Sequence, residues 1–145
     1  MKKSLALLAA LIALTPISAK DSAKQEVAMP TQNQSQKKLG GLTPEAALEF
    51  LKKNPDAVIV EVNTDYWKLK TGFIGAIHIP HDQMERRYGE IPAGRPVILH
   101  CGAGVVSVPA YETLLEKRPD IPVLGYIAGR PPVAEYNEWK KAQGR

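Results

Sequence analysis

The chain has 145 residues, a formal net charge of +4 and a single cysteine. This small positive charge, without a basic stripe interleaved with aromatic side chains, does not favour a nucleic-acid-binding protein. A lone cysteine excludes an internal disulfide, so Cys101 is either a free thiol or an intermolecular partner.

The first 19 residues have the pattern of a secretory signal peptide. Lys2 and Lys3 supply the positive start, residues 5–14 form an apolar run, and the segment closes on small residues up to Ala19. This run is too short to cross a bilayer. We therefore expect a periplasmic protein without a membrane span, whose mature form has about 126 residues, enough for one domain with its own core.

The next segment, residues 20–40, is polar, rich in Gln and without hydrophobic periodicity. Such a segment cannot bury enough apolar surface to offset the entropy lost on ordering. We expect a flexible linker here, followed by one folded domain over residues 41–145.

Helix and strand patterns alternate along this domain. Thr43 is placed to cap a helix that starts at Pro44, and its apolar face should contain Ala47, Phe50 and Leu51. The other predicted helices cover residues 82–88, 107–117 and 132–143, and a polar stretch at 64–71 could also be helical. Short apolar runs predict strands at 57–62, 76–79, 96–100 and 122–127. This alternation predicts a parallel sheet covered by helices on both faces.

Cys101 directly follows the predicted strand 96–100, and ligands of such sheets bind at the carboxyl ends of strands. A strand that turns tightly into a helix points several backbone N–H groups at one place, which stabilises a thiolate. We expect Gly102 and Gly104 to allow the curled backbone through positive φ angles. We expect Ser107 to cap the following helix, which carries the apolar residues Val108, Tyr111 and Leu115 on one side.

Five motifs, in order over residues 42–143, resemble the single-domain rhodanese (sulfurtransferase) family. They are the opening helix at 42–51, the strand end at 58–63, the segment Gly-Phe-Ile-Gly-Ala-Ile-His-Ile-Pro at 72–80, the loop Cys-Gly-Ala-Gly-Val-Val-Ser at 101–107, and Gly129 with Trp139. The resemblance implies a three-layer α/β fold, with a central parallel sheet of about five strands flanked by helices.

The resemblance also implies a reaction. Cys101 would take a sulfane sulfur from a thiosulfate- or polysulfide-type donor, become a persulfide, and pass the sulfur to a thiol or to cyanide. No metal or organic cofactor is expected. The backbone amides of the loop would bind the charged sulfur; these belong to Gly102, Ala103, Gly104, Val105, Val106 and Ser107.

The loop departs from the family pattern because it has no Arg or Lys; Gly102, Val105 and Val106 stand where a cation is usual. Glu61 and Asn63 stand in place of the strand-end Asp and Arg of the family. Loss of the cation should weaken the binding of a dianion such as thiosulfate most.

Arg130 follows the last predicted strand, and the family's topology makes it a candidate substrate-binding residue; a solvated turn residue is the alternative. His100 should point away from Cys101, since successive side chains of a strand alternate, and we expect it to be packed or hydrogen-bonded. His78 and His81 are expected at the surface. No metal-ligand spacing joins the histidines to a Cys or carboxylate cluster.

Two other functions compete with the sulfurtransferase. The first is a catalytically weak or inactive rhodanese module that binds a partner or a sulfur species. The second is a phosphatase of the same fold, which needs an Arg six residues after the cysteine, where this chain has Ser107. The sequence does not indicate an oligomeric state.

Overall fold

The structure is a computed structural model that describes residues 35–144. The predicted signal peptide and most of the predicted linker lie outside this range. No helix within it is long and apolar enough to cross a membrane.

Five parallel strands form the central sheet, in the order β1-β5-β4-β2-β3. Their bounds are β1 (Lys37–Leu42), β2 (Val58–Glu61), β3 (Ile77–His78), β4 (Val97–His100) and β5 (Val123–Ile127). The middle strand, β4, pairs with β2 on one side and with β5 on the other. The predicted parallel sheet of about five strands is therefore confirmed.

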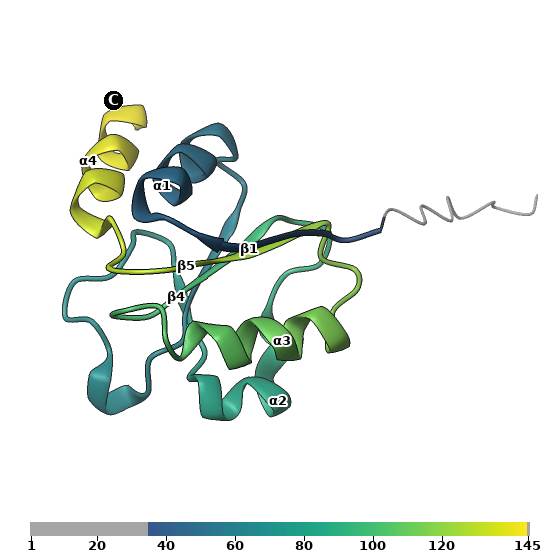
Figure 1. The fold of residues 1–145 in the computed structure, drawn as a ribbon. Helices are drawn as coiled ribbons and strands as arrows, with labels where there is room; N and C mark the ends of the chain where they lie inside the picture. Colours follow the sequence, from purple (N-terminus) through teal and green to yellow (C-terminus); the bar gives the residue numbers. More distant parts are fainter. Residues whose placement is uncertain (1–34, 145) are drawn as a thin grey trace, which may run out of the picture. The chain divides into compact units, whose positions relative to one another are not determined.

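Helices cover both faces of this sheet (Figure 1). One face carries α1 (Pro44–Lys53) and α4 (Val133–Gln143), and the other carries α2 (Met84–Arg87) and α3 (Ser107–Lys117). The bounds of α3 are those predicted from the sequence. Three short 3-10 helices complete the list: Asp65–Trp67, His81–Gln83 and Tyr88–Glu90. The polar stretch at 64–71 is thus helical over only three residues.

Each face of the sheet has its own hydrophobic core. Val97, Leu99 and Cys101 pack toward α2 and α3, whereas Ile98 packs toward α1 and α4. Every residue of β4 is buried, as expected of a parallel strand covered on both faces. Burial of each large aliphatic side chain stabilises the fold by about 1.5–3 kcal/mol. The carboxyl end of β4 is therefore a rigid support for the residue that follows it.

The first helix begins as the sequence predicts. The Thr43 side chain accepts a hydrogen bond of 3.2 Å from the backbone N–H of Ala46, and Pro44 occupies the first turn. Ala47 and Leu51 are buried on the inner side, and Phe50 packs against them half-buried.

The start of the folded part differs from the expected residue 41, because β1 begins at Lys37. Its pairing with β5 shifts register between Lys38 and Gly40, and Gly40 has a φ of 65°. This irregularity breaks the alternation by which a strand is recognised in a sequence. The last residues of the predicted linker are therefore part of the sheet.

The buried side of α3 also differs from the apolar side of the sequence pattern in two of its three residues. Tyr111 is buried, but Val108 is 36% exposed and Leu115 is only half-buried. The fully inward positions belong to Ser107, Ala110 and Leu114 instead. The first of these places a hydroxyl rather than an apolar group beneath the cysteine loop.

Candidate functional site

The Cys101 thiol lies at the carboxyl end of the central strand, inside the loop that leads into α3. Its Sγ accepts a hydrogen bond from the backbone N–H of Gly104 at 3.0 Å. Only 2% of the residue is exposed, yet it contributes to the wall of a pocket. The loop therefore curls around the sulfur, as its position after a strand predicts.

Opposing effects act on the pKa of this thiol. Burial raises the pKa, but the Ser107 hydroxyl and the backbone N–H groups of Ala103, Val106 and Gly104 lower it, and the net pKa is below that of an ordinary thiol. Each of these donors favours the thiolate because it can donate to a negative sulfur. The site thus stabilises the nucleophilic form with neutral dipoles alone.

Ser107 does not cap α3, contrary to the prediction. The N-cap residue is Val106, which has no capping side chain, and the Ser107 side chain is fully buried. Its hydroxyl oxygen is buried and has no hydrogen-bond partner within residues 35–144. It lies beside the sulfur and lowers the thiol pKa, because a hydroxyl there can donate to a thiolate.

The two loop glycines differ, although the sequence predicts a positive φ at both. Gly104 has a φ of 87°, and a Cβ there would lie 2.8 Å from the Gly129 nitrogen and 2.9 Å from the Ile127 carbonyl oxygen. Gly102 does not have a positive φ, and a Cβ there would meet nothing within 4 Å. Only Gly104 is therefore required by the backbone.

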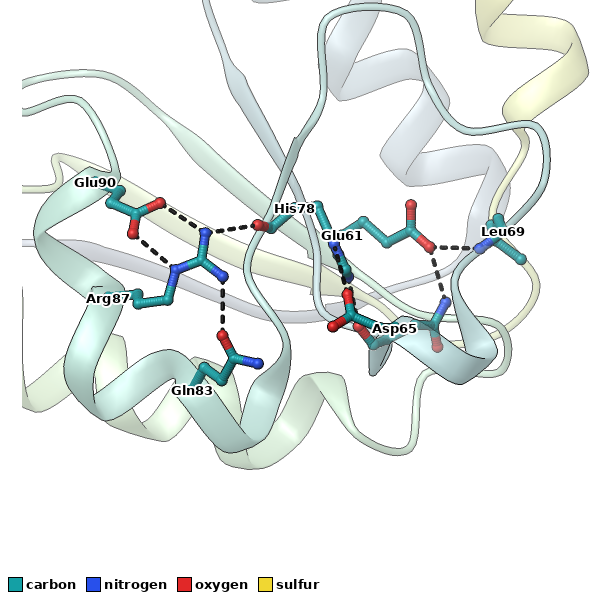
Figure 2. A network of polar contacts seen from close by, with 8 residues as sticks. Glu61, Asp65, Leu69, His78, Gln83, Arg87 and Glu90 are labelled. Carbon is teal, nitrogen blue, oxygen red and sulfur yellow. Dashed lines mark hydrogen bonds and ion pairs between the residues drawn. The ribbon is translucent and has the colours of Figure 1, made fainter.

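Asn63 braces the loop from the neighbouring strand end. Its Oδ1 accepts a hydrogen bond from the Gly102 N–H at 3.3 Å, and its Nδ2 donates to Glu61 Oε1 at 3.2 Å. The buried Glu61 carboxylate also accepts a hydrogen bond of 2.7 Å from the Leu69 N–H (Figure 2). The Gly102 amide is thus occupied by Asn63 rather than aimed at the sulfur, and Glu61 ties the segment after β2 to the sheet.

His78 holds the same segment from β3. Its Nε2 lies 2.7 Å from the Asn63 carbonyl oxygen, and its Nδ1 lies 3.6 Å from Asp65. The His78 carbonyl in turn accepts a hydrogen bond from Arg87, which also pairs with Glu90 (Figure 2). His78 is therefore a half-buried bracing residue rather than the surface residue that the sequence predicts.

A pocket of about 560 Å³ opens at the thiol. Its wall has few polar side chains, and no residue that lines it in the described part of the chain is Lys or Arg. Trp67 and Val105, at 70% and 73% exposed, both line it. The lining consists of Asn63, Thr64, Trp67, Leu69, His81, Cys101, Gly102, Ala103, Val105 and Val106. Local sequence patterns do not identify Trp67 and His81 as site residues, because only the fold brings them to the thiol.

Arg130 lies in a different hollow, of about 780 Å³, and does not line the thiol pocket. The two hollows share Leu69 and Gly102 as lining residues. The structure therefore places Arg130 beside the site, without bringing it into the pocket that Cys101 lines.

His100 is fully buried on the opposite face of β4 from Cys101, and its ring meets Phe73 edge-on at 4.8 Å. Neither ring nitrogen has a hydrogen-bond partner within residues 35–144. Burial lowers the pKa of His100 to about 4; Glu61 raises it and His78 lowers it further. The expected packed histidine is confirmed, and it is neutral at pH 7, so it supplies no cation to the loop.

This burial predicts an acid-sensitive fold. Between pH 6.5 and 4 the unfolded chain binds a proton at His100 that the folded chain does not, so stability is lost as the pH falls through this window. The difference amounts to roughly 3 kcal/mol. Urea unfolding at several pH values measures this loss. Between pH 6.5 and 4, the free energy of unfolding should fall by roughly 3 kcal/mol less in a His100→Leu variant than in the wild type. Equal losses in the two proteins would show that His100 titrates normally.

No group of three or more His, Cys, Asp or Glu side chains within residues 35–144 is arranged to hold a metal ion.

Comparison with known proteins gives structural similarity only. No family model and no curated protein matches the sequence. A rhodanese-related protein from Thermoplasma volcanium aligns with a TM-score of 0.51 and 14% identity, over 68% of this chain and 91% of that chain. A protein from M. tuberculosis aligns with a TM-score of 0.51 and 26% identity, over 62% and 78%. A protein from Staphylococcus saprophyticus aligns with a TM-score of 0.51 and 18% identity, over 68% of this chain and 93% of that chain. With the parallel sheet and its flanking helices, these similarities show a rhodanese-like fold.

Proposed function

We propose that this protein is a sulfurtransferase in which Cys101 carries a sulfane sulfur as a persulfide. One observation supports this most: the only thiol of the chain directly follows the central strand, in a loop whose Gly104 nitrogen lies 3.0 Å from the sulfur. That loop lowers the thiol pKa, which increases the fraction of nucleophilic thiolate. The rhodanese-like fold is consistent with this chemistry.

The reaction has two displacement steps. The Cys101 thiolate attacks the sulfane sulfur of the donor, a new S–S bond forms, and the donor's own S–S bond breaks. With thiosulfate, sulfite leaves with the bonding electron pair. Cyanide or a thiolate then attacks the outer sulfur of the persulfide and releases the Cys101 thiolate. The N–H groups of Ala103, Gly104 and Val106 stabilise the charge at each stage, because they already lower the thiol pKa.

The pocket favours some donors over others. Thiosulfate is a dianion, and no Lys or Arg lines the thiol pocket to compensate for its charge. A polysulfide spreads its charge over a longer chain of sulfur atoms, and these atoms can contact the apolar part of the pocket wall. We therefore assign polysulfide-type donors a higher rate than thiosulfate, with a thiol or cyanide as acceptor.

The signal-like segment at residues 1–19 supports a periplasmic location for this reaction. The displacement steps need neither a metal nor an organic cofactor, since the thiolate is the nucleophile and the donor supplies the leaving group.

Steady-state kinetics test the proposal. Purified protein with inorganic polysulfide and cyanide should form thiocyanate at a rate proportional to enzyme concentration. An Arg86→Gln variant, altered at an exposed residue of α2, is the control and should match the wild type. Absence of enzyme-dependent thiocyanate with polysulfide and with thiosulfate would refute the proposal.

The second candidate is a module that binds a sulfur species or a partner without turnover. The lack of a cation in the thiol pocket favours it. A persulfide that forms on Cys101 but is never released to cyanide or to a thiol would support this candidate over the enzyme.

Restoring a cation should change the choice of donor. Gly102 has open space at its Cβ and no positive φ, so the backbone and the Cβ position accept Gly102→Arg without strain. A guanidinium beside the thiol should raise the rate with thiosulfate by about tenfold or more, since charge stabilisation in a shielded site contributes a few kcal/mol. Thiocyanate formation from thiosulfate measures this, with Gly102→Leu as the uncharged control. An equal gain in both variants would exclude a charge effect.

A further inference from the structure

We propose that the hollow containing Arg130 and the thiol pocket form one extended donor site, joined across Gly102, that accepts the persulfide of an amino acid or short peptide. This inference rests on the proposed sulfurtransferase function and names the donor class of the same site. The hollow is called the Arg130 hollow below.

The two cavities are adjacent because they share Gly102 and Leu69. Gly102 presents no side chain, and a Cβ built there would meet nothing within 4 Å. Its backbone is fixed by the hydrogen bond of 3.3 Å to Asn63 Oδ1. The border between the cavities is therefore a backbone ridge, over which an extended ligand can lie.

The combined size exceeds the needs of an inorganic donor. The thiol pocket measures about 560 Å³ and the Arg130 hollow about 780 Å³, each within the range of about 300–1,000 Å³ typical of small-molecule sites. Thiosulfate has only a few atoms and would leave most of this space empty. An organic donor with a sulfur at one end can occupy both.

The charges of the Arg130 hollow are mixed. Arg130 is exposed and makes no ion pair with a carboxylate of residues 35–144, so it is available to bind a carboxylate of the ligand. Glu45 and Glu135, in the first turns of α1 and α4, line the same hollow and can bind an ammonium group. An α-amino acid carries both groups, whereas thiosulfate and inorganic polysulfide carry no cation.

The thiol pocket suits the other end of such a donor. Trp67, Leu69 and Val106 offer apolar surface to a methylene group and to sulfur. The Cys101 thiolate attacks the terminal sulfur of the donor R–S–SH, and a Cys101 persulfide forms as the donor S–S bond breaks. The thiolate R–S⁻ leaves with the electron pair and takes a proton from water.

The test compares two donors that differ in their end groups: cysteine persulfide, and ethyl persulfide, which carries neither carboxylate nor ammonium. The rate of sulfur addition to Cys101 is measured for each donor by mass spectrometry. The rate with cysteine persulfide divided by the rate with ethyl persulfide measures how much the Arg130 hollow contributes to donor binding. The ratio should fall about tenfold in Arg130→Gln, since a hydrogen bond to a charged group is lost. Arg130→Lys should restore part of it, and Gly102→Leu should lower it by blocking the ridge.

Arg86→Gln removes an exposed arginine elsewhere and should leave the ratio unchanged. A wild-type protein that does not prefer cysteine persulfide, or an Arg130→Gln variant with an unaltered ratio, overturns the extended site while the sulfurtransferase stands. If the wild type takes no sulfur from either persulfide or from inorganic polysulfide, the proposed function itself is wrong.

Discussion

Cys101→Ser should abolish sulfur transfer, lowering the rate of thiocyanate formation from polysulfide by at least about a thousandfold. A hydroxyl at this position cannot form a persulfide, and no second thiol in the chain can replace it. The loop should stay intact, because the oxygen of serine can accept the hydrogen bond that Gly104 donates to sulfur at 3.0 Å.

Circular dichroism and thermal unfolding establish that the Cys101→Ser variant is folded, and Cys101→Ala provides a second variant without a polar atom. Both should be equally inactive. Turnover retained in either variant would mean that sulfur transfer in the assay does not pass through Cys101.

Gly104→Ala should destabilise the folded protein by about 4 kcal/mol. The backbone there has a φ of 87°, and the added Cβ would approach the Gly129 nitrogen to 2.8 Å and the Ile127 carbonyl oxygen to 2.9 Å. Both contacts are with backbone, so relief requires the cysteine loop to move away from the end of β5. That movement also withdraws the N–H that donates to the Cys101 sulfur.

Gly102→Ala is the matched control, since its Cβ enters open space and its φ is not positive. Urea unfolding should place this variant within about 0.5 kcal/mol of the wild type. A similar loss of stability at both positions would mean that the loop responds to any side chain, and that the approach to β5 is not the cause.

Local patterns in the sequence were sufficient for much of the fold. Three features depend only on neighbouring residues, and the structure has them as predicted. They are the cap at Thr43 followed by Pro44, the β-branched run of β2, and the bounds of α3. The position of Cys101 at a strand end follows from the same local patterns.

The rest of the site depends on contacts between distant segments. The Gly102 N–H donates its hydrogen bond to Asn63, which lies 39 residues away in the sequence. The strict need for glycine at 104 comes from β5 and the residues after it, and His81 lines the thiol pocket only because β3 ends beside β2. The position of Ser107 at the start of a helix predicts a helix cap. In the structure, Ser107 lies on the buried side of α3, beside the Cys101 sulfur.

The most direct test of the persulfide on Cys101 is mass spectrometry of the purified protein after exposure to inorganic polysulfide. We expect the mass of one sulfur atom to be added, to map to the peptide containing Cys101, and to disappear on treatment with cyanide as thiocyanate forms. A protein whose Cys101 gains no sulfur, while remaining open to alkylation, would contradict the assignment of Cys101 as the sulfur carrier.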